Sequence, residues 1–170
     1  MSRQPEPLGV VFDCMVFLQA AANRNSASAR VLALVETGEI KLFVSEEILN
    51  ELREVLSRPK VRSRLKQISD ADVIALYRRL DRRAYWLRDV PRTFQYSRDP
   101  KDELYINLAV AAGAAYLVSR DTDLLDLMTG SSAECKEFRQ RFRGLKIIDP
   151  PSLLTEIQRR RELVRRTEGK

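Results

Sequence analysis

Short apolar segments of the kind found in β-strands alternate along this chain with longer segments whose apolar residues recur at helical spacing. That alternation is typical of a parallel sheet with helices on both of its faces. The strands are expected at residues 8–13, 41–44, 84–87, 115–119 and 145–148. The pattern therefore predicts an α/β fold, a single three-layer domain built on a five-stranded parallel sheet.

The expected helices lie between these strands. They are residues 28–38, a helix that begins at Ser45, residues 69–83, 100–113 and 122–129, and a C-terminal helix that begins at Pro151. Gly38 is a good helix stop, and Ser45 and Pro151 are residue types preferred where helices start. We expect one globular domain at 8–158, a disordered segment at 1–7 and a basic tail at 159–170, with disorder at 167–170.

The length of 170 residues suits a single domain with a substantial core. No apolar run approaches the roughly 20 residues needed to span a bilayer, and the N-terminus lacks the apolar core of a signal peptide. These features lead us to expect a cytoplasmic protein. Cys14 and Cys135 fall in separate expected elements without a CxxC spacing, so they are expected to be free thiols.

The absence of histidine narrows the chemistry open to this chain. It excludes Ser-His-Asp and Cys-His catalysis, and also the histidine pair by which metal-free ribonucleases supply acid and base. With only two cysteines, it argues against a zinc site as well. Any hydrolysis must therefore come from carboxylates and a metal ion.

The formal net charge of +6 favours a polyanionic partner. Much of the positive charge lies at residues 139–146 and 159–166. The second of these segments fits a solvated basic helix as well as a nucleic-acid contact.

Acidic residues stand at the ends of the expected elements. Asp13 and Asp121 follow strands, Asp102 opens a helix, and Glu51 is the acid nearest the apolar face of its helix. The carboxyl ends of parallel strands share one edge of the sheet, so Asp13 and Asp121 converge if the first and fourth strands are neighbours. Carboxylates gathered there make a magnesium or manganese site.

Each of these acids also has an ordinary structural explanation. Asp13 and Asp99 fit helix caps, and Glu51 fits a solvated helix face. Asp102 is expected to stay ionised beside a helix N-terminus. One of Asp121 and Asp123 is expected to be a cap. Two acids this close together at the end of a strand are also costly unless a cation neutralises them.

Four motifs in order resemble those of the PIN domain, and most closely the branch of this family described as toxins of toxin–antitoxin systems. They are VFD at 11–13, VSEEILNEL at 44–52 with VLSRP at 55–59, RDPKDE at 98–103, and YLVSRDTDLL at 116–125. The resemblance spans residues 10–154.

The resemblance implies a divalent-metal-dependent ribonuclease that uses Mg²⁺ or Mn²⁺. It assigns catalytic roles to Asp13, Glu51, Asp102 and Asp121, and metal binding to Asp13, Asp102, Asp121 and Asp123. Ser119 and Asp99 are expected to hold these ligands in position without binding the metal themselves. The implied partners are an RNA substrate, a cognate antitoxin protein and a second copy of the chain in a homodimer.

Two departures from the family pattern bear on function. Cys14 and Met15 stand where the family usually has a hydroxyl residue and asparagine, and loss of supporting polar groups commonly costs 10- to 100-fold in metal affinity or activity. Segment 129–144 is longer than usual. Its basic residues fit either RNA contact or a cover for the sheet edge; they are Lys136, Arg139, Arg141 and Arg143.

Two other functions remain open from the sequence. One is a PIN fold with weakened catalysis that acts as an RNA-binding module, which the residues at 14 and 15 favour. The other is a receiver-like phosphoacceptor domain, although such domains want paired acids after the first strand and an acceptor aspartate after the third. This chain has Asp13-Cys14 at the first position and only Asp89 near the second.

Overall fold

Strands β1 (Leu8–Phe12) and β4 (Tyr116–Val118) lie side by side at the centre of a five-stranded parallel sheet. The computed structural model describes residues 5–169, and its strand order is β3-β2-β1-β4-β5. The other strands are β2 (Ile40–Ser45), β3 (Tyr85–Leu87) and β5 (Lys146–Ile148). All five predicted strands are confirmed, each within two residues at either end. Strand order reverses at β1 and β4, which places the expected ligand edge beyond Phe12 and Val118.

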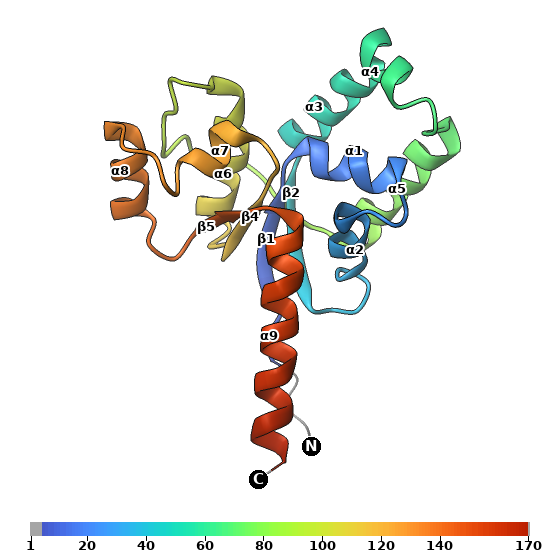
Figure 1. Ribbon diagram of the computed structural model, residues 1–170. Coiled ribbons are helices and arrows are strands. Elements are labelled where there is room, and N and C mark those ends of the chain that lie inside the picture. Colours follow the sequence, from blue (N-terminus) through green and yellow to red (C-terminus); the bar gives the residue numbers. More distant parts are fainter. Residues whose placement is uncertain (1–4, 170) are drawn as a thin grey trace.

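Helices lie on both sides of this sheet, so the predicted three-layer architecture is confirmed (Figure 1). On one side are α1 (Cys14–Ala22), α2 (Ala27–Ala33), α3 (Glu46–Ser57), α4 (Pro59–Arg64) and α5 (Asp70–Arg83). On the other are the 3₁₀ turn η1 (Pro100–Asp102), α6 (Glu103–Ala111), α7 (Thr122–Asp126) and α8 (Ala133–Arg141). The sheet core is apolar, and Val10, Val11, Leu42 and Leu117 are fully buried within it.

Several helix boundaries follow from the capping residues that the sequence shows. Ser45 caps α3 by accepting a hydrogen bond from the Ile48 amide, and Ser69 forms a capping box with Asp72 at the start of α5. The predicted helix at 28–38 is shorter, because α2 ends at Ala33 and turns follow. Gly38 then adopts a φ of 74°, a left-handed conformation that glycine enters without strain.

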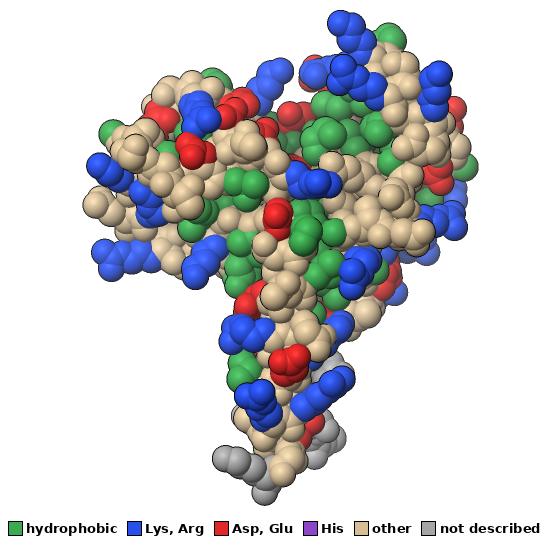
Figure 2. All heavy atoms as spheres, viewed as in Figure 1, with side chains coloured by type: hydrophobic (Ala, Val, Ile, Leu, Met, Phe, Trp, Pro, Cys, Tyr) green, Lys and Arg blue, Asp and Glu red, His purple; other side chains and the backbone are tan. Residues whose placement is uncertain are grey.

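Helix α9 (Pro150–Glu168) extends well beyond the rest of the domain (Figure 1). Residues 159–168, predicted as a basic tail with disorder from 167, continue this helix. Arg159 pairs with Glu156 on the same helix and Arg161 with Glu39, so part of the basic segment is neutralised within the chain. Figure 2 accordingly shows acidic side chains among the basic ones along α9.

The predicted disordered ends are only partly covered by the structure. Residues 1–4 and 170 lie outside the described residues, and residues 5–7 belong to neither a helix nor a strand. Across the described part of the chain, no helix is long and apolar enough to cross a membrane. Cys14 and Cys135 are both buried free thiols, as predicted.

An extended loop at residues 88–99 carries the chain from β3 to η1 and is fixed by buried contacts. The Asn107 side chain accepts hydrogen bonds from the amides of Thr93 and Phe94 at 3.0 and 2.8 Å, and donates one to the Phe94 carbonyl at 3.2 Å. The Phe94 ring packs edge-on against Phe138 of α8. The loop therefore reaches Asp99 in a defined conformation.

Candidate metal centre

Three aspartates converge beyond the carboxyl end of β4. One carboxylate oxygen each from Asp99, Asp102 and Asp121 lies within 4.8 Å of the other two. Asp99 caps η1 and accepts a hydrogen bond from the Lys101 amide at 3.1 Å through Oδ1. Asp121 caps α7 and accepts from the Asp123 amide at 2.8 Å, also through Oδ1. Each cap engages one carboxylate oxygen, which leaves the second available to a ligand.

Asp102 is the most constrained member of this group. Its side chain is 7% exposed, and within residues 5–169 its Oδ2 is buried without a hydrogen-bond partner. Burial, and then the charges of Asp121 and Asp99, raise the pKa of Asp102 to about 8. The expectation that the helix N-terminus keeps this acid ionised is wrong for the metal-free protein, because burial and like charges outweigh the helix dipole.

Asp13 lies behind the group and is linked to it through Ser119. Asp13 caps α1 by accepting from the Val16 amide at 3.0 Å, and its Oδ2 accepts from the buried Ser119 hydroxyl. The Ser119 oxygen in turn accepts from the Asp121 amide at 2.9 Å. Burial raises the pKa of Asp13 to about 6, although the Ser119 hydrogen bond opposes that shift. Asp13 is therefore the helix cap that was weighed as its structural explanation, and its role as a metal ligand stays a prediction.

Glu51 is half-buried on α3, whereas Glu46, Glu47 and Glu54 are exposed, as its helical position predicted. Its Oε2 accepts a hydrogen bond from the Tyr105 hydroxyl of α6. Burial raises the pKa of Tyr105 well above its usual range, so this hydroxyl remains a donor. Among the described residues Glu51 is not part of the three-aspartate group.

The residues that depart from the family pattern lie next to these acids. Cys14 is buried, and burial, followed by the charge of Glu51, raises its pKa to about 12, so the thiol is neutral. Met15 is 44% exposed, so its side chain does not fill the core. Neither side chain supplies the supporting polar group that the usual family residues would offer at this rim.

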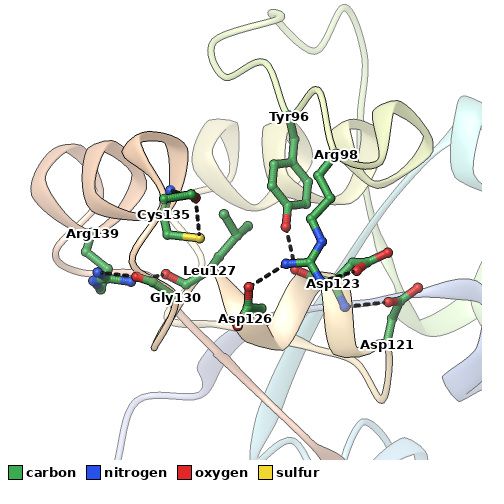
Figure 3. Close-up of polar contacts among 10 residues, drawn as sticks. Tyr96, Arg98, Asp121, Asp123, Asp126, Leu127, Gly130, Cys135 and Arg139 are labelled. Carbon is green, nitrogen blue, oxygen red and sulfur yellow. Dashed lines mark hydrogen bonds and ion pairs between the residues drawn. The ribbon is translucent and has the colours of Figure 1, made fainter.

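Asp123 is half-buried and lies outside the three-aspartate group. Arg98 holds it through a 2.8 Å contact between Nη2 and Oδ1, and pairs with Asp126 through Nη1. Figure 3 shows the Arg98 guanidinium reaching across to the acids of α7. Sequence reasoning did not single out Arg98 or Tyr105, and the only signal for Arg98 is its place directly before Asp99.

Two of the four basic residues expected to contact RNA are bound within the chain. Arg139 donates to the carbonyls of Leu127 and Gly130 at 2.7 and 2.8 Å. Arg141 donates to the Thr93 carbonyl at 3.0 Å. Lys136 and Arg143 are exposed.

A family model for the PIN domain matches residues 9–123, which is more than half of the chain. The chain belongs to the PIN domain family. No match was found among curated proteins. The matched part of this PIN domain contains Asp99, Asp102 and Asp121 together with Asp13, Glu51 and Asp123, while α8, β5 and α9 lie beyond it.

PIN domains form a nuclease family whose members typically use divalent metal ions. The acids of this PIN domain suit such an ion. Their donors are all carboxylate oxygens, the type preferred by Mg²⁺ and Mn²⁺. The buried Asp102 Oδ2 is an acceptor that a cation would satisfy. The composition of the site and its unpartnered oxygen therefore both fit a hard divalent cation.

Replacement of Arg139 is expected to destabilise the protein, whereas replacement of Arg143 is not. Arg139→Gln should lower the free energy of unfolding by about 1–3 kcal/mol, because two carbonyls lose their donors. Arg143→Gln should leave stability within about 0.5 kcal/mol, since the residue is exposed. Urea unfolding measures both changes. Equal stability of the two variants would contradict the structural role of Arg139.

Proposed function

We propose that this PIN-domain protein is a divalent-metal-dependent endoribonuclease that hydrolyses RNA phosphodiester bonds. The observation that carries the proposal is the convergence of Asp99, Asp102 and Asp121, of which the buried Asp102 has an Oδ2 without a hydrogen-bond partner within the described chain. Such an arrangement is unfavourable for folding unless a cation occupies it. Residues held in an unfavourable arrangement are characteristic of functional sites.

The side chains have distinct roles in this proposal. Asp102 and Asp121 bind the cation, and Asp13 adds negative charge from behind while fixing Asp121 through Ser119. A bound Mg²⁺ or Mn²⁺ would lower the pKa of a water nucleophile and offset charge on the leaving oxygen. Glu51, oriented by Tyr105, adds a further carboxylate near Cys14. No histidine is needed for this chemistry.

RNA binding would rest on exposed basic side chains that have no structural role. Lys136 and Arg143 meet that condition better than Arg139 and Arg141, whose guanidinium groups bind backbone carbonyls. Because phosphate contacts of this kind release counterions, RNA affinity should fall steeply with salt.

The activity is tested with purified protein and a labelled single-stranded RNA. Cleavage is expected with Mg²⁺ or Mn²⁺ and should stop in excess EDTA. Asp121→Asn keeps the volume of the side chain and its capping oxygen but removes the charge, so it should lower the cleavage rate by at least about 100-fold, the scale of losing a key electrostatic group.

Asp81→Asn is the matched control, because Asp81 is an exposed aspartate on α5. It should cleave RNA at the rate of the unmodified protein. Cleavage that persists in EDTA would reject the mechanism. Salt-sensitive RNA binding without metal-dependent cleavage would instead favour the RNA-binding module.

We further propose that the protein acts in the cytoplasm as the toxin component of a type II toxin–antitoxin system, as a homodimer with a cognate antitoxin. This finer assignment is supported by the motif resemblance at residues 98–103 and 116–125. Induced expression in a bacterial host should arrest growth, and Asp121→Asn should relieve the arrest. A neighbouring gene for a small DNA-binding protein whose coexpression restores growth would identify the antitoxin.

A further inference from the structure

Two aspartates in the chain compete to complete a cation site around Asp102 and Asp121. Asp123 follows Asp121 by two residues and is the candidate that the motif favours. Asp99 comes from the loop before η1 and looks like a simple cap in the sequence. The structure treats these two side chains differently.

Asp99 has a carboxylate oxygen within 4.8 Å of ligand atoms of both Asp102 and Asp121. It is half-buried, and its capping contact to the Lys101 amide engages Oδ1 alone. Its charge also raises the pKa of Asp102 more than the charge of Asp13 or Asp123 does. Asp99 is therefore placed to share a cation with Asp102, whose buried Oδ2 has no hydrogen-bond partner within the described residues.

The Asp123 side chain is instead paired with Arg98. The guanidinium contacts Asp123 Oδ1 at 2.8 Å and Asp126 Oδ2 at the same time. The Tyr96 hydroxyl donates to the Asp123 carbonyl at 2.7 Å, which fixes the backbone as well (Figure 3). Arg98 offsets the charge of the Asp123 carboxylate and fixes its Oδ1 beside Asp126, which weakens the attraction of this side chain for a cation.

We propose that Asp99, together with Asp102 and Asp121, forms the cation site of this chain, and that Arg98 is a positioning residue that keeps Asp123 out of it. The inference rests on the proposed metal-dependent function. Neighbouring residues 98 and 99 thus have complementary roles, since one supplies a ligand and the other neutralises the acid that would compete with it.

Calorimetric titration of the full chain with Mn²⁺ tests this assignment. Asp99→Asn should weaken the affinity about 10- to 100-fold, as loss of a group needed at a metal site commonly does. Asparagine is as good a cap as aspartate, so the turn at η1 is preserved. Asp123→Asn should weaken binding by less than about fivefold, the effect of a screened and already neutralised charge.

The positioning role of Arg98 has a signature that a purely structural role lacks. Arg98→Gln removes a positive charge and releases Asp123, so the variant should bind Mn²⁺ at least as tightly as the unmodified protein. In the Asp99→Asn background it should recover at least about half of the lost binding free energy, because coupled neighbours are not additive. Tyr96→Phe, which removes another contact of the same loop to α7, should give no such recovery.

The outcomes separate this inference from the proposed function. If the unmodified protein binds no Mn²⁺, or if Asp102→Asn binds it equally well, the metal-dependent function itself is rejected. If the unmodified protein binds Mn²⁺ but Asp123→Asn loses as much affinity as Asp99→Asn, only the present assignment is overturned. Weaker Mn²⁺ binding by a cooperatively folded Arg98→Gln variant would reject its positioning role.

Discussion

Asp102→Asn is expected to stabilise the metal-free protein while it abolishes cation binding and RNA cleavage. Asp102 is 7% exposed, its Oδ2 has no partner within the described residues, and two other aspartates lie beside it. Removal of an unsatisfied buried acceptor in a repulsive group should raise the free energy of unfolding by about 1–3 kcal/mol. For a chain of this size that corresponds to a rise of roughly 3–10 °C in Tm.

The stability gained by Asp102→Asn should increase with pH. The pKa of Asp102 is raised to about 8 in the folded protein, above its unfolded value of 3.8. The folded state therefore holds this proton more tightly, and the stability contributed by the protonated group is fully present below about pH 4 and lost as pH rises through about 8. The advantage of Asp102→Asn over the unmodified protein should accordingly be larger at pH 8.5 than at pH 5.

Thermal unfolding in EDTA and in Mg²⁺ measures both effects. Mg²⁺ should raise the Tm of the unmodified protein by ligand linkage and leave that of Asp102→Asn unchanged. Asp81→Asn, at an exposed position, should follow the unmodified protein under both conditions. A lower Tm for metal-free Asp102→Asn would mean that this carboxylate has a stabilising partner and is not held ready for a cation.

The sequence predicted where this site lies better than it predicted which residues form it. Apolar strand segments with acids at their carboxyl ends placed Asp13 and Asp121 on the same edge, and neighbouring β1 and β4 bear this out. Which of Asp99 and Asp123 lies with Asp102 and Asp121 could not be predicted from that pattern. It depends on Arg98, whose contacts to α7 join residues 25 or more positions apart in the chain.

Helices α1 and α8 escaped prediction for opposite reasons. Helix α1 begins with a run of apolar residues that are nearly all buried, so its sequence shows no helical period. Helix α8 buries only Cys135 and Phe138, too few positions to establish a period. The same sparse pattern left Arg139 and Arg141 as candidates for RNA contact, because a sequence does not show which arginines meet backbone carbonyls.

Asn107→Ala is expected to destabilise the protein strongly. Asn107 is 4% exposed and makes three hydrogen bonds to the backbone of Thr93 and Phe94. Alanine leaves the buried amide and carbonyl of Phe94 unpaired, so the free energy of unfolding should fall by roughly 2–4 kcal/mol. Asn50→Ala, at an exposed asparagine on α3, should change it by less than about 0.5 kcal/mol.

The same substitution should also weaken cation binding. The loop fixed by Asn107 ends at Asp99, five residues after Phe94, so a loosened loop displaces one of the three acids while leaving Asp102 and Asp121 in place. Mn²⁺ affinity of Asn107→Ala, measured where the variant remains folded, should therefore fall by about tenfold. In the Asp99→Asn background the further loss should nearly vanish, because the group that the loop positions is already gone. Full additivity of the two losses would show that Asn107 supports the site by a route other than Asp99.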